Sequence, residues 1–358
     1  MKAKQFNLKK ISRRAFGTTV AGALMSVFVG ATALTAAPAA EAANYNMHII
    51  RFGYGLATDS TQGRAAQFFA QDLSKRTGGK LNMKTFGNAS LGSDDQMQNA
   101  LIGGSQEMMV GSTTTLVGIV DDFGVYDLPF LFSNEKEADA VLDGPIGQRL
   151  LDSLQKKGLV GIVYWENGFR DLTNSKHPIN TMADMQGVKL RVMQNPMYID
   201  MFKGMGANPV PLSFSELFTA MESHTVDGQE NPINTILSNK FYEVQKYLTI
   251  TNHVYTPFIV LASKQWWDKL NPDEQAAIMA SARDARDFQR KDNRAENAHA
   301  LADLKAKGMQ VSVPAPAELA KMRAAASPQV AKFAAQSPSH AQLVKDIQTQ
   351  LATLRGGK

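Results

Sequence analysis

The sequence predicts an α/β fold of two domains crossed by one long helix. Short apolar runs of strand length alternate with segments whose apolar residues recur at helical spacing, which is the pattern of α/β layers. The 315 residues that follow position 43 exceed what one compact core usually holds, so two domains are expected. After Pro272, a helical pattern without a further Pro or an internal Gly continues to Gly308. This is a helix of about 50 Å, longer than one small domain is wide.

Residues 1–43 are expected to be an export signal that is removed. An uncharged stretch rich in Ala, Gly, Val and Thr follows a basic start, and Ala40-Glu41-Ala42 suits a signal peptidase that cleaves near Ala42 or Ala43. A membrane anchor is the alternative, but the most apolar part, residues 20–29, is short for a bilayer. The basic start contains Lys2, Lys4, Lys9, Lys10, Arg13 and Arg14.

The pair Arg13-Arg14 leaves the export route open. Ser12-Arg13-Arg14-Ala15-Phe16 resembles a twin-arginine signal, whose machinery carries folded proteins. Paired arginines also occur in ordinary secretory signals. Either route predicts an exported protein.

Charge and cysteine content narrow the function classes. After position 43 the chain has 32 basic and 32 acidic residues. The basic isoelectric point of about 9.2 therefore belongs to the leader and predicts no nucleic-acid surface. The chain contains no cysteine, which excludes disulfides, thiol nucleophiles, Cys-ligated zinc and a lipoprotein anchor. We expect a soluble periplasmic protein.

The individual elements follow from periodicity and capping residues. A helix is expected over Ser60–Arg76, ended by Gly78-Gly79, and another over 96–102. Ser213 and Glu216 form a capping box, and Asn271-Pro272 supplies an N-cap with Pro at the first helical position. Strands, in largely parallel sheets, are expected at residues 47–52, 81–86, 107–110, 159–165 and 188–192.

Enzyme signatures are absent from the linear sequence. There is no G-x-S-x-G elbow, no phosphate-binding G-x-x-x-x-G-K-[ST] loop and no H-E-x-x-H motif, and the six histidines are scattered without metal-like spacing. We expect no catalytic residues, no metal and no cofactor. A pair of carboxylates brought together only by the fold would have no signature of this kind in the linear sequence.

Three ordered motifs carry a family resemblance. They are Y-W-E-N-G-F-R-D-L-T-N-S from Tyr164, D-M-Q-G-V-K-L-R-V from Asp184, and G-A-N-P-V-P-L-S-F-S-E-L-F-T-A from Gly206, which leads into V-D-G-Q-E-N-P from Val226. The segments that start at Asp127, Lys240 and Thr251 fit as well. Together these motifs resemble the DctP-type binding proteins of tripartite ATP-independent periplasmic (TRAP) transporters, over essentially the whole chain after the leader.

The resemblance implies a fold and a set of partners. It implies two α/β domains joined by a hinge, a periplasmic binding protein type II-like clamshell, with the ligand cleft between the domains and the long helix crossing both. The first domain is expected over 44–167 and about 256–295, and the second over 168–255 and about 296–358. A small organic acid and the membrane permease subunits are the implied partners. No dimerisation signature is present, so a monomer is expected.

The resemblance also implies the carboxylate site. Arg191 lies at the position of the family's carboxylate clamp, and a guanidinium suits this role because its planar fork of donors matches a carboxylate. Asn231 corresponds to an asparagine that helps to hold the same group, although it precedes a proline and could be a turn residue. Arg170 corresponds to a second ligand-facing arginine, or it braces the hinge through Glu166 or Asp171.

Five further residues complete the predicted site. Phe214 and Gln194 fall at positions that often line the cleft, and Phe214 has a core position as its alternative. Ser112 and Thr113 should reach the cleft from the first domain. Some relatives carry a carboxylate there, so its absence suggests a ligand without a cationic group. Trp165 offers an aromatic platform, although a buried Trp in a strand usually serves packing.

The ligand is expected to be a sugar acid: an aldonate, a ketoaldonate or a uronate. Residues 164–170 and 193–197 look more like members of the family that bind sugar acids. A C4-dicarboxylate, or another hydroxy or oxo acid, is the alternative, and Arg170 would then hold the second carboxylate. The other classes that remain are a binding protein of an ATP-driven transporter, a chemosensory ligand binder and a periplasmic enzyme that modifies sugar acids.

Overall fold

The computed structural model describes residues 43–356. The predicted export signal, and its cleavage site apart from Ala43, lie outside the described residues. Within the described range, no helix is both long enough and apolar enough to cross a membrane.

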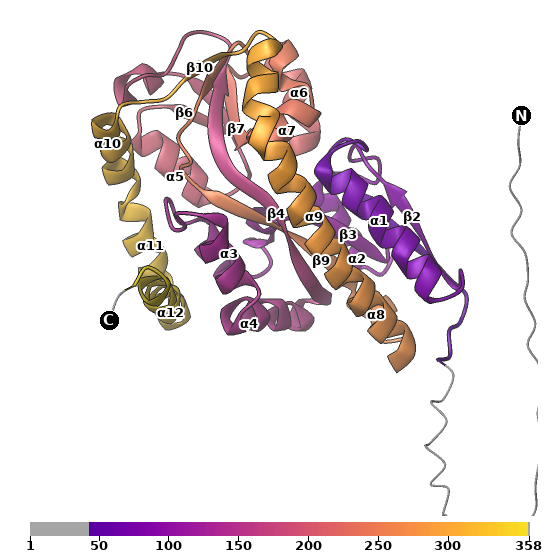
Figure 1. Ribbon diagram of the computed structural model, residues 1–358. Coiled ribbons are helices and arrows are strands. Elements are labelled where there is room, and N and C mark those ends of the chain that lie inside the picture. Colours follow the sequence, from indigo (N-terminus) through magenta and orange to yellow (C-terminus); the bar gives the residue numbers. More distant parts are fainter. Residues whose placement is uncertain (1–42, 357–358) are drawn as a thin grey trace, which may run out of the picture. The chain divides into compact units, whose positions relative to one another are not determined.

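A mixed sheet runs through the described part of the chain (Figure 1). Its strand order is β2-β1-β3-β9-β4-β7-β5-β6, and β8 and β10 pair beside this path. The strands are β1 His48–Tyr54, β2 Leu81–Phe86, β3 Met108–Ser112, β4 Leu159–Asn174, β5 Lys189–Val192, β6 Asn208–Pro211, β7 Gly228–Pro232, β8 Tyr247–Thr249, β9 Tyr255–Ser263 and β10 Gln310–Ser312.

Helices cover both faces of the sheet (Figure 1). The α-helices are α1 Thr61–Arg76, α2 Asp94–Ile102, α3 Glu135–Leu142, α4 Pro145–Ser153, α5 Pro196–Gly204, α6 Phe214–Glu222, α7 Ile233–Ser238, α8 Lys264–Trp267, α9 Pro272–Ala306, α10 Pro316–Ala326, α11 Pro328–Gln336 and α12 Pro338–Leu354. Short 3₁₀ helices are η1 Thr113–Leu116, η2 Asp121–Asp127, η3 Leu154–Lys157, η4 Met182–Met185 and η5 Phe241–Glu243.

Strand β4 joins two parts of the sheet. It pairs antiparallel with β9 up to Phe169, and from Arg170 onward it pairs with β7 and β8. The pairs β1–β2, β1–β3, β5–β6 and β5–β7 are parallel, whereas every antiparallel pair involves β4 or β9. The sheet is therefore mixed, and the expected parallel pairing is found only on either side of the crossing strands.

The second half of β4 was not predicted as a strand. The sequence expectation stopped at residue 165, because residues 166–174 contain charged and amide side chains instead of an apolar pattern. All but one of these residues are nevertheless buried. They can be buried because distant segments satisfy their polar groups, as Thr251 and Asn252 do by donating backbone N–H groups to Asp171.

Helix α9 begins and ends where the sequence predicts. The Asn271 side chain accepts a hydrogen bond from the Glu274 backbone N–H at 3.0 Å. Its Ile278 and Ala282 pack with Phe69 of α1, whereas its Leu304 packs with Leu217 of α6. The helix therefore spans two separate apolar cores, and Figure 1 shows it running from α8 to α7.

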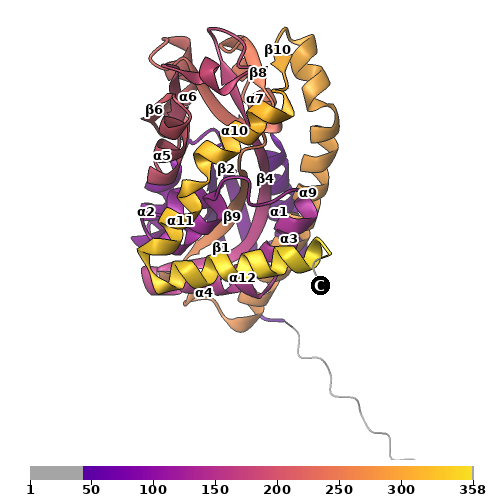
Figure 2. The ribbon, with the colours of Figure 1, turned by 90° about the vertical axis from the view of Figure 1, so that its left-hand side faces the viewer.

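The C-terminal helices divide between the two parts of the fold. Met322 of α10 packs with Phe202 of α5, beyond the crossing strands. Ile347 of α12 instead shares a core with Val141 of α3 and Leu150 of α4, and Figure 2 shows α12 passing in front of α4. The sequence-based boundary placed this whole segment in the second domain.

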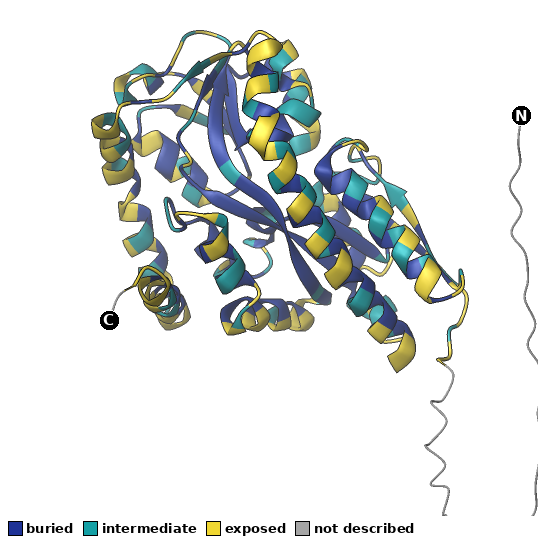
Figure 3. Ribbon diagram, in the orientation of Figure 1, coloured by how far each residue is buried: buried dark blue, intermediate teal, exposed yellow. Residues whose placement is uncertain are grey.

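Burial follows this layered arrangement. Figure 3 shows the central strands buried, while the outward faces of α9, α10 and α12 are exposed. This is the pattern of helices that each bury one stripe against a sheet.

Candidate ligand-binding site

A cavity of about 50 Å³ lies where the two parts of the fold face each other. Strands β1, β3 and β5 end here, and helices α2 and α6 begin here. Six of the eight predicted site residues line it: Arg170, Arg191, Asn231, Phe214, Gln194 and Ser112. Crevices outside the carboxyl ends of parallel strands are the usual ligand sites of α/β proteins.

Arg191 of β5 is a buried cation without a carboxylate partner. Arg191 is 2% exposed, and its Nε and Nη2 donate to the Leu212 carbonyl oxygen at 2.9 and 2.7 Å. Its Nη1 has no hydrogen-bond partner among residues 43–356, and no carboxylate in this range lies within 4.0 Å of the guanidinium.

Burial lowers the pKa of Arg191 to about 10, which still leaves the guanidinium charged at neutral pH. A buried positive charge with an unpaired donor is costly unless an anion compensates it. The guanidinium therefore presents an uncompensated positive charge and an unpaired donor at the cavity wall.

Arg170 of β4 is compensated within the protein. Its side chain is fully buried and pairs with Glu230 through Nε, and through Nη2 at 2.9 Å. Its Nη1 donates to Thr256 Oγ1 at 3.2 Å. His253 Nε2 lies 3.1 Å from the same Glu230 carboxylate. The partner is neither of the two carboxylates that the sequence suggested.

The Glu230 carboxylate stays ionised between these partners. Burial alone would raise the pKa of Glu230, but the positive charge of Arg170 and the hydrogen bond from His253 hold this pKa below its usual value. Glu230 therefore neutralises Arg170, and little of the positive charge of Arg170 is left to attract a ligand.

Asn231 is a strand residue rather than a turn residue. It lies in β7, opposite Asp171 of β4, and is 4% exposed. Its Oδ1 accepts a hydrogen bond from Arg170 Nη2 at 3.1 Å, and its Nδ2 donates to Gln229. Asn231 is thus held rigidly at the cavity wall.

The structure places Thr113 and Trp165 outside the cavity lining. Thr113 follows Ser112 and turns away from the cavity, and its Oγ1 donates to the Pro257 carbonyl oxygen at 3.3 Å. Trp165 is 0% exposed, and its ring centroid lies 6.2 Å from that of Phe52. Trp165 therefore occupies a packing position, which was the alternative to its predicted role as an aromatic platform.

Several cavity residues were not predicted from the sequence, among them the neighbouring carboxylates Asp94 and Asp95. Asp94, the first residue of α2, lines the cavity, and its Oδ2 accepts the Ser112 backbone N–H at 2.9 Å. The first domain was expected to bring no carboxylate to this place, so the conclusion drawn from its absence, that the ligand has no cationic group, loses its basis. The helix here was expected over 96–102, whereas α2 begins two residues earlier, at Asp94, with Ser93 as its N-cap.

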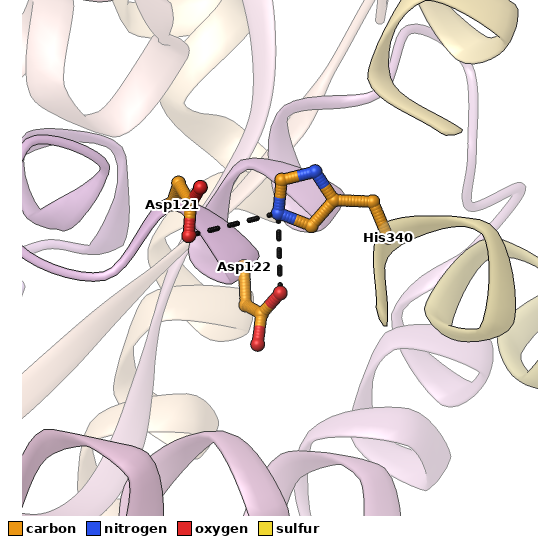
Figure 4. Close-up of side chains that lie close together, drawn as sticks. All are labelled: Asp121, Asp122 and His340. Carbon is orange, nitrogen blue, oxygen red and sulfur yellow. Dashed lines mark ion pairs between the residues drawn. The ribbon is translucent and has the colours of Figure 1, made fainter. Parts of the chain in front are cut away.

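One group of side chains among residues 43–356 lies close enough together to hold a metal ion, and it is remote from this cavity. Figure 4 shows His340 of α12 facing Asp121 and Asp122 at the start of η2, with Nε2 to carboxylate distances of 3.7 and 3.1 Å. The imidazole also stacks on Phe333, with centroids 4.2 Å apart. These contacts fasten α12 to η2.

The fold and the arginine-lined cavity together define a solute-binding protein. The family described as bacterial extracellular solute-binding protein, family 7 (DctP) matches residues 52–337, and the chain belongs to this family. The predicted resemblance is confirmed, and so is the predicted fold class of two α/β lobes joined by a hinge.

Several relatives match most of the chain. The sugar acid binding protein DctPAm from Advenella mimigardefordensis, solved with galactonate, is 50% identical, has a TM-score of 0.83, and is matched over 86% of this chain and 100% of its own. A TRAP periplasmic solute-binding protein from Polaromonas sp. JS666, bound to D-erythronate, is 39% identical with a TM-score of 0.80, over 84% and 98%. The 2,3-diketo-L-gulonate-binding periplasmic protein YiaO of Escherichia coli is 42% identical, over 68% of this chain and 74% of its own.

Proposed function

We propose that this protein captures a sugar acid in the periplasm by holding its carboxylate on Arg191, and that it delivers the acid unchanged to the membrane permease of a TRAP transporter. The observation that carries the proposal is the buried Arg191 guanidinium, which faces the cavity with an unpaired Nη1 and no carboxylate partner in the described range. The galactonate, erythronate and diketogulonate named for the relatives all combine one carboxylate with oxygen-bearing carbons.

The rest of the cavity suits hydroxyl groups. Gln194, Asn167 and Ser112 contribute amide and hydroxyl groups to the lining, and Phe214 contributes an aromatic face. A buried ligand hydroxyl needs such partners, because leaving it unpaired costs free energy. This lining supports an aldonate, a ketoaldonate or a uronate.

A C4-dicarboxylate receives less support from the geometry. The second arginine of the cavity, Arg170, would have to hold the second carboxylate, but its donors already face Glu230, Thr256 and Asn231. A second carboxylate there would compete with Glu230 for the same charge.

Closure of the two lobes around the ligand completes the proposed mechanism. We place the hinge where β4 and β9 cross, with the first lobe over 44–167, 256–295 and 327–354 and the second over 168–255 and 296–326. This boundary moves α11 and α12 to the first lobe because of their packing. A ligand drives closure only if it binds the closed form better than the open form. We propose that a closed monomer, freed of its leader near Ala42 or Ala43, is the form that meets the permease.

The proposal is tested on the exported chain, residues 44–358, after unfolding and refolding to remove co-purified ligand. Thermal melting is measured with D-galactonate, D-galacturonate, 2,3-diketo-L-gulonate, D-erythronate, succinate and galactose. A ligand at about 100 times its dissociation constant adds about 2.7 kcal/mol of stability, which shifts melting by several degrees. A shift with a sugar acid but none with galactose is the expected result. Recovery of the bound acid unchanged, by mass spectrometry, tests the absence of catalysis.

Two results would contradict the proposal. A shift with succinate alone would replace the sugar acid by a dicarboxylate. No shift with any acid would remove the role assigned to Arg191.

A further inference from the structure

The cavity contains an acidic side chain that faces the same space as Arg191. Asp94 stands at the start of α2, directly after the N-cap Ser93. Its Oδ2 is fixed by the Ser112 backbone N–H at 2.9 Å, whereas its Oδ1 receives no hydrogen bond from residues 43–356. The free oxygen lies beside Gly55, another residue of the cavity wall.

The fold makes room for this carboxylate. A Cβ atom at Gly111 would lie 2.8 Å from both Cγ and Oδ2 of Asp94, closer than real Cβ contacts. Glycine at this position therefore lets the carboxylate lie directly against β3. A Cβ atom at Gly55 would lie 3.6 Å from Oδ1, an ordinary contact distance, and glycine leaves even this space beside the free oxygen without a side chain.

The electrostatics keep Asp94 ionised at neutral pH. Burial raises the pKa of Asp94 to about 6, with a smaller increase from the neighbouring Asp95, while the Ser112 N–H and the charge of Arg191 oppose the rise. At pH 7.5 the carboxylate form predominates. The cavity thus presents an unpaired cationic donor and an unpaired anionic acceptor that interact with each other across it.

Such a pair matches a ligand that carries a carboxylate at one end and a hydroxyl farther along its chain. The carboxylate compensates Arg191, and a hydroxyl donates to Asp94 Oδ1. A charged acceptor makes a stronger hydrogen bond with a hydroxyl than a neutral one does. A second ligand carboxylate near Asp94 would have no proton to donate at neutral pH, and it would be repelled.

We propose that Asp94 determines specificity: its free carboxylate oxygen accepts a hydroxyl of the bound acid and excludes a second carboxylate, so that the cavity selects polyhydroxy monocarboxylates over dicarboxylates. This inference rests on the proposed function, since it takes Arg191 as the site of the first carboxylate.

The test compares wild type with Asp94→Asn by isothermal titration calorimetry at pH 7.5. The ligands are two matched pairs, D-erythronate with meso-tartrate and D-galactonate with galactarate. Within each pair, only a terminal CH₂OH is replaced by a carboxylate. Any effect of Asp94 on the first carboxylate is common to both members, so it cancels in the ratio of their dissociation constants. Wild type is expected to prefer the monoacid, and Asp94→Asn should reduce that preference by about tenfold or more.

Asp152→Asn is the matched control, because it removes the same charge from an exposed side chain of α4 outside the cavity. Its ratio should equal that of wild type, and thermal melting checks that each variant is folded.

A second measurement needs no variant: on lowering the pH of wild type from 7.5 to 5.0, Asp94 gains a proton and the monoacid preference should fall. Asp95 and Arg191 are the charged groups that act on Asp94, and Arg191 does not titrate in this range.

The outcomes separate the two proposals. If wild type binds the monoacids, but the ratio is unchanged both in Asp94→Asn and at pH 5.0, the role of Asp94 is overturned and the role of Arg191 stands. If wild type binds neither pair, the proposed function itself fails. If wild type prefers the diacids, both proposals are wrong.

Discussion

Replacing Glu230 with Gln is expected to destabilise the protein strongly, because Glu230 compensates a fully buried arginine. The side chains of Arg170 and Glu230 are both 0% exposed, and His253 Nε2 lies 3.1 Å from the same Glu230 carboxylate. Removing one partner of such a pair leaves an uncompensated buried charge, which costs about 3–5 kcal/mol. The pKa of Glu230 lies below its usual value, so the substitution removes a full negative charge at neutral pH.

The assay is urea unfolding of the exported chain at pH 7.5, without ligand. Glu107→Gln is the control, because Glu107 pairs with Arg51 on the surface at 2.7 Å and the Arg51 side chain is 45% exposed. A surface pair of this kind contributes about 0–1 kcal/mol. If Glu230→Gln lost no more free energy of unfolding than this control, the reasoning that Arg170 is neutralised by Glu230 would be refuted. In the folded variant, the released Arg170 should also increase the affinity for meso-tartrate.

Three further predictions follow from local geometry. Burial raises the pKa of Asp171 to about 7, above the unfolded value of about 3.9, so the folded state holds a proton that the unfolded state has lost. The contribution of this group to stability is therefore lost as the pH rises from about 4 to 7, and Asp171→Asn should be more stable relative to wild type at pH 8 than at pH 5. Equal differences in urea midpoints at the two pH values would contradict this. Asn271→Ala removes the N-cap of α9 and should cost about 0.5–2 kcal/mol in thermal unfolding, whereas Asn271→Ser should restore most of it. Gly111→Ala should displace the Asp94 carboxylate and weaken the monoacid preference seen by calorimetry, and an unchanged ratio would show that Asp94 is not held against β3.

The starts of α1 and α9 could be predicted from the sequence because capping is local. The Ser60 hydroxyl accepts the Gly63 N–H at 3.1 Å, and the Asn271 side chain caps α9, within three residues in both cases. Strands that alternate or are uniformly apolar were also predictable, and β2 has the expected bounds.

The second half of β4 could not be predicted in this way. Its Arg170 and Asp171 are buried because Glu230 and the backbone of residues 251–252 supply their partners. These partners are tens of residues away in the sequence, so the pattern of residues 166–174 does not indicate burial. The same limit applies to α12, whose apolar stripe fits a core in either lobe.

The candidate site shows a similar division. The family resemblance supplied Arg191, Asn231 and Arg170, but residue type does not say which way a side chain points at the end of a strand. Ser112 faces the cavity while its neighbour Thr113 does not. Asp94 was missed because the helix was expected to begin only at residue 96, which left Asp94 in the preceding loop.

The role of Arg191 in holding the carboxylate is tested by the dissociation constant of the Arg191→Ala variant for D-galactonate, measured by titration calorimetry beside wild type. Removing the buried cation that faces a bound carboxylate should cost about 2–5 kcal/mol of binding free energy. Binding should therefore weaken by a factor of about 30 or more, while thermal melting shows a folded protein. Arg191→Lys should restore little of the affinity, because an ammonium group lacks the planar fork of donors. Near-normal affinity in a folded Arg191→Ala protein would show that this arginine does not hold the ligand.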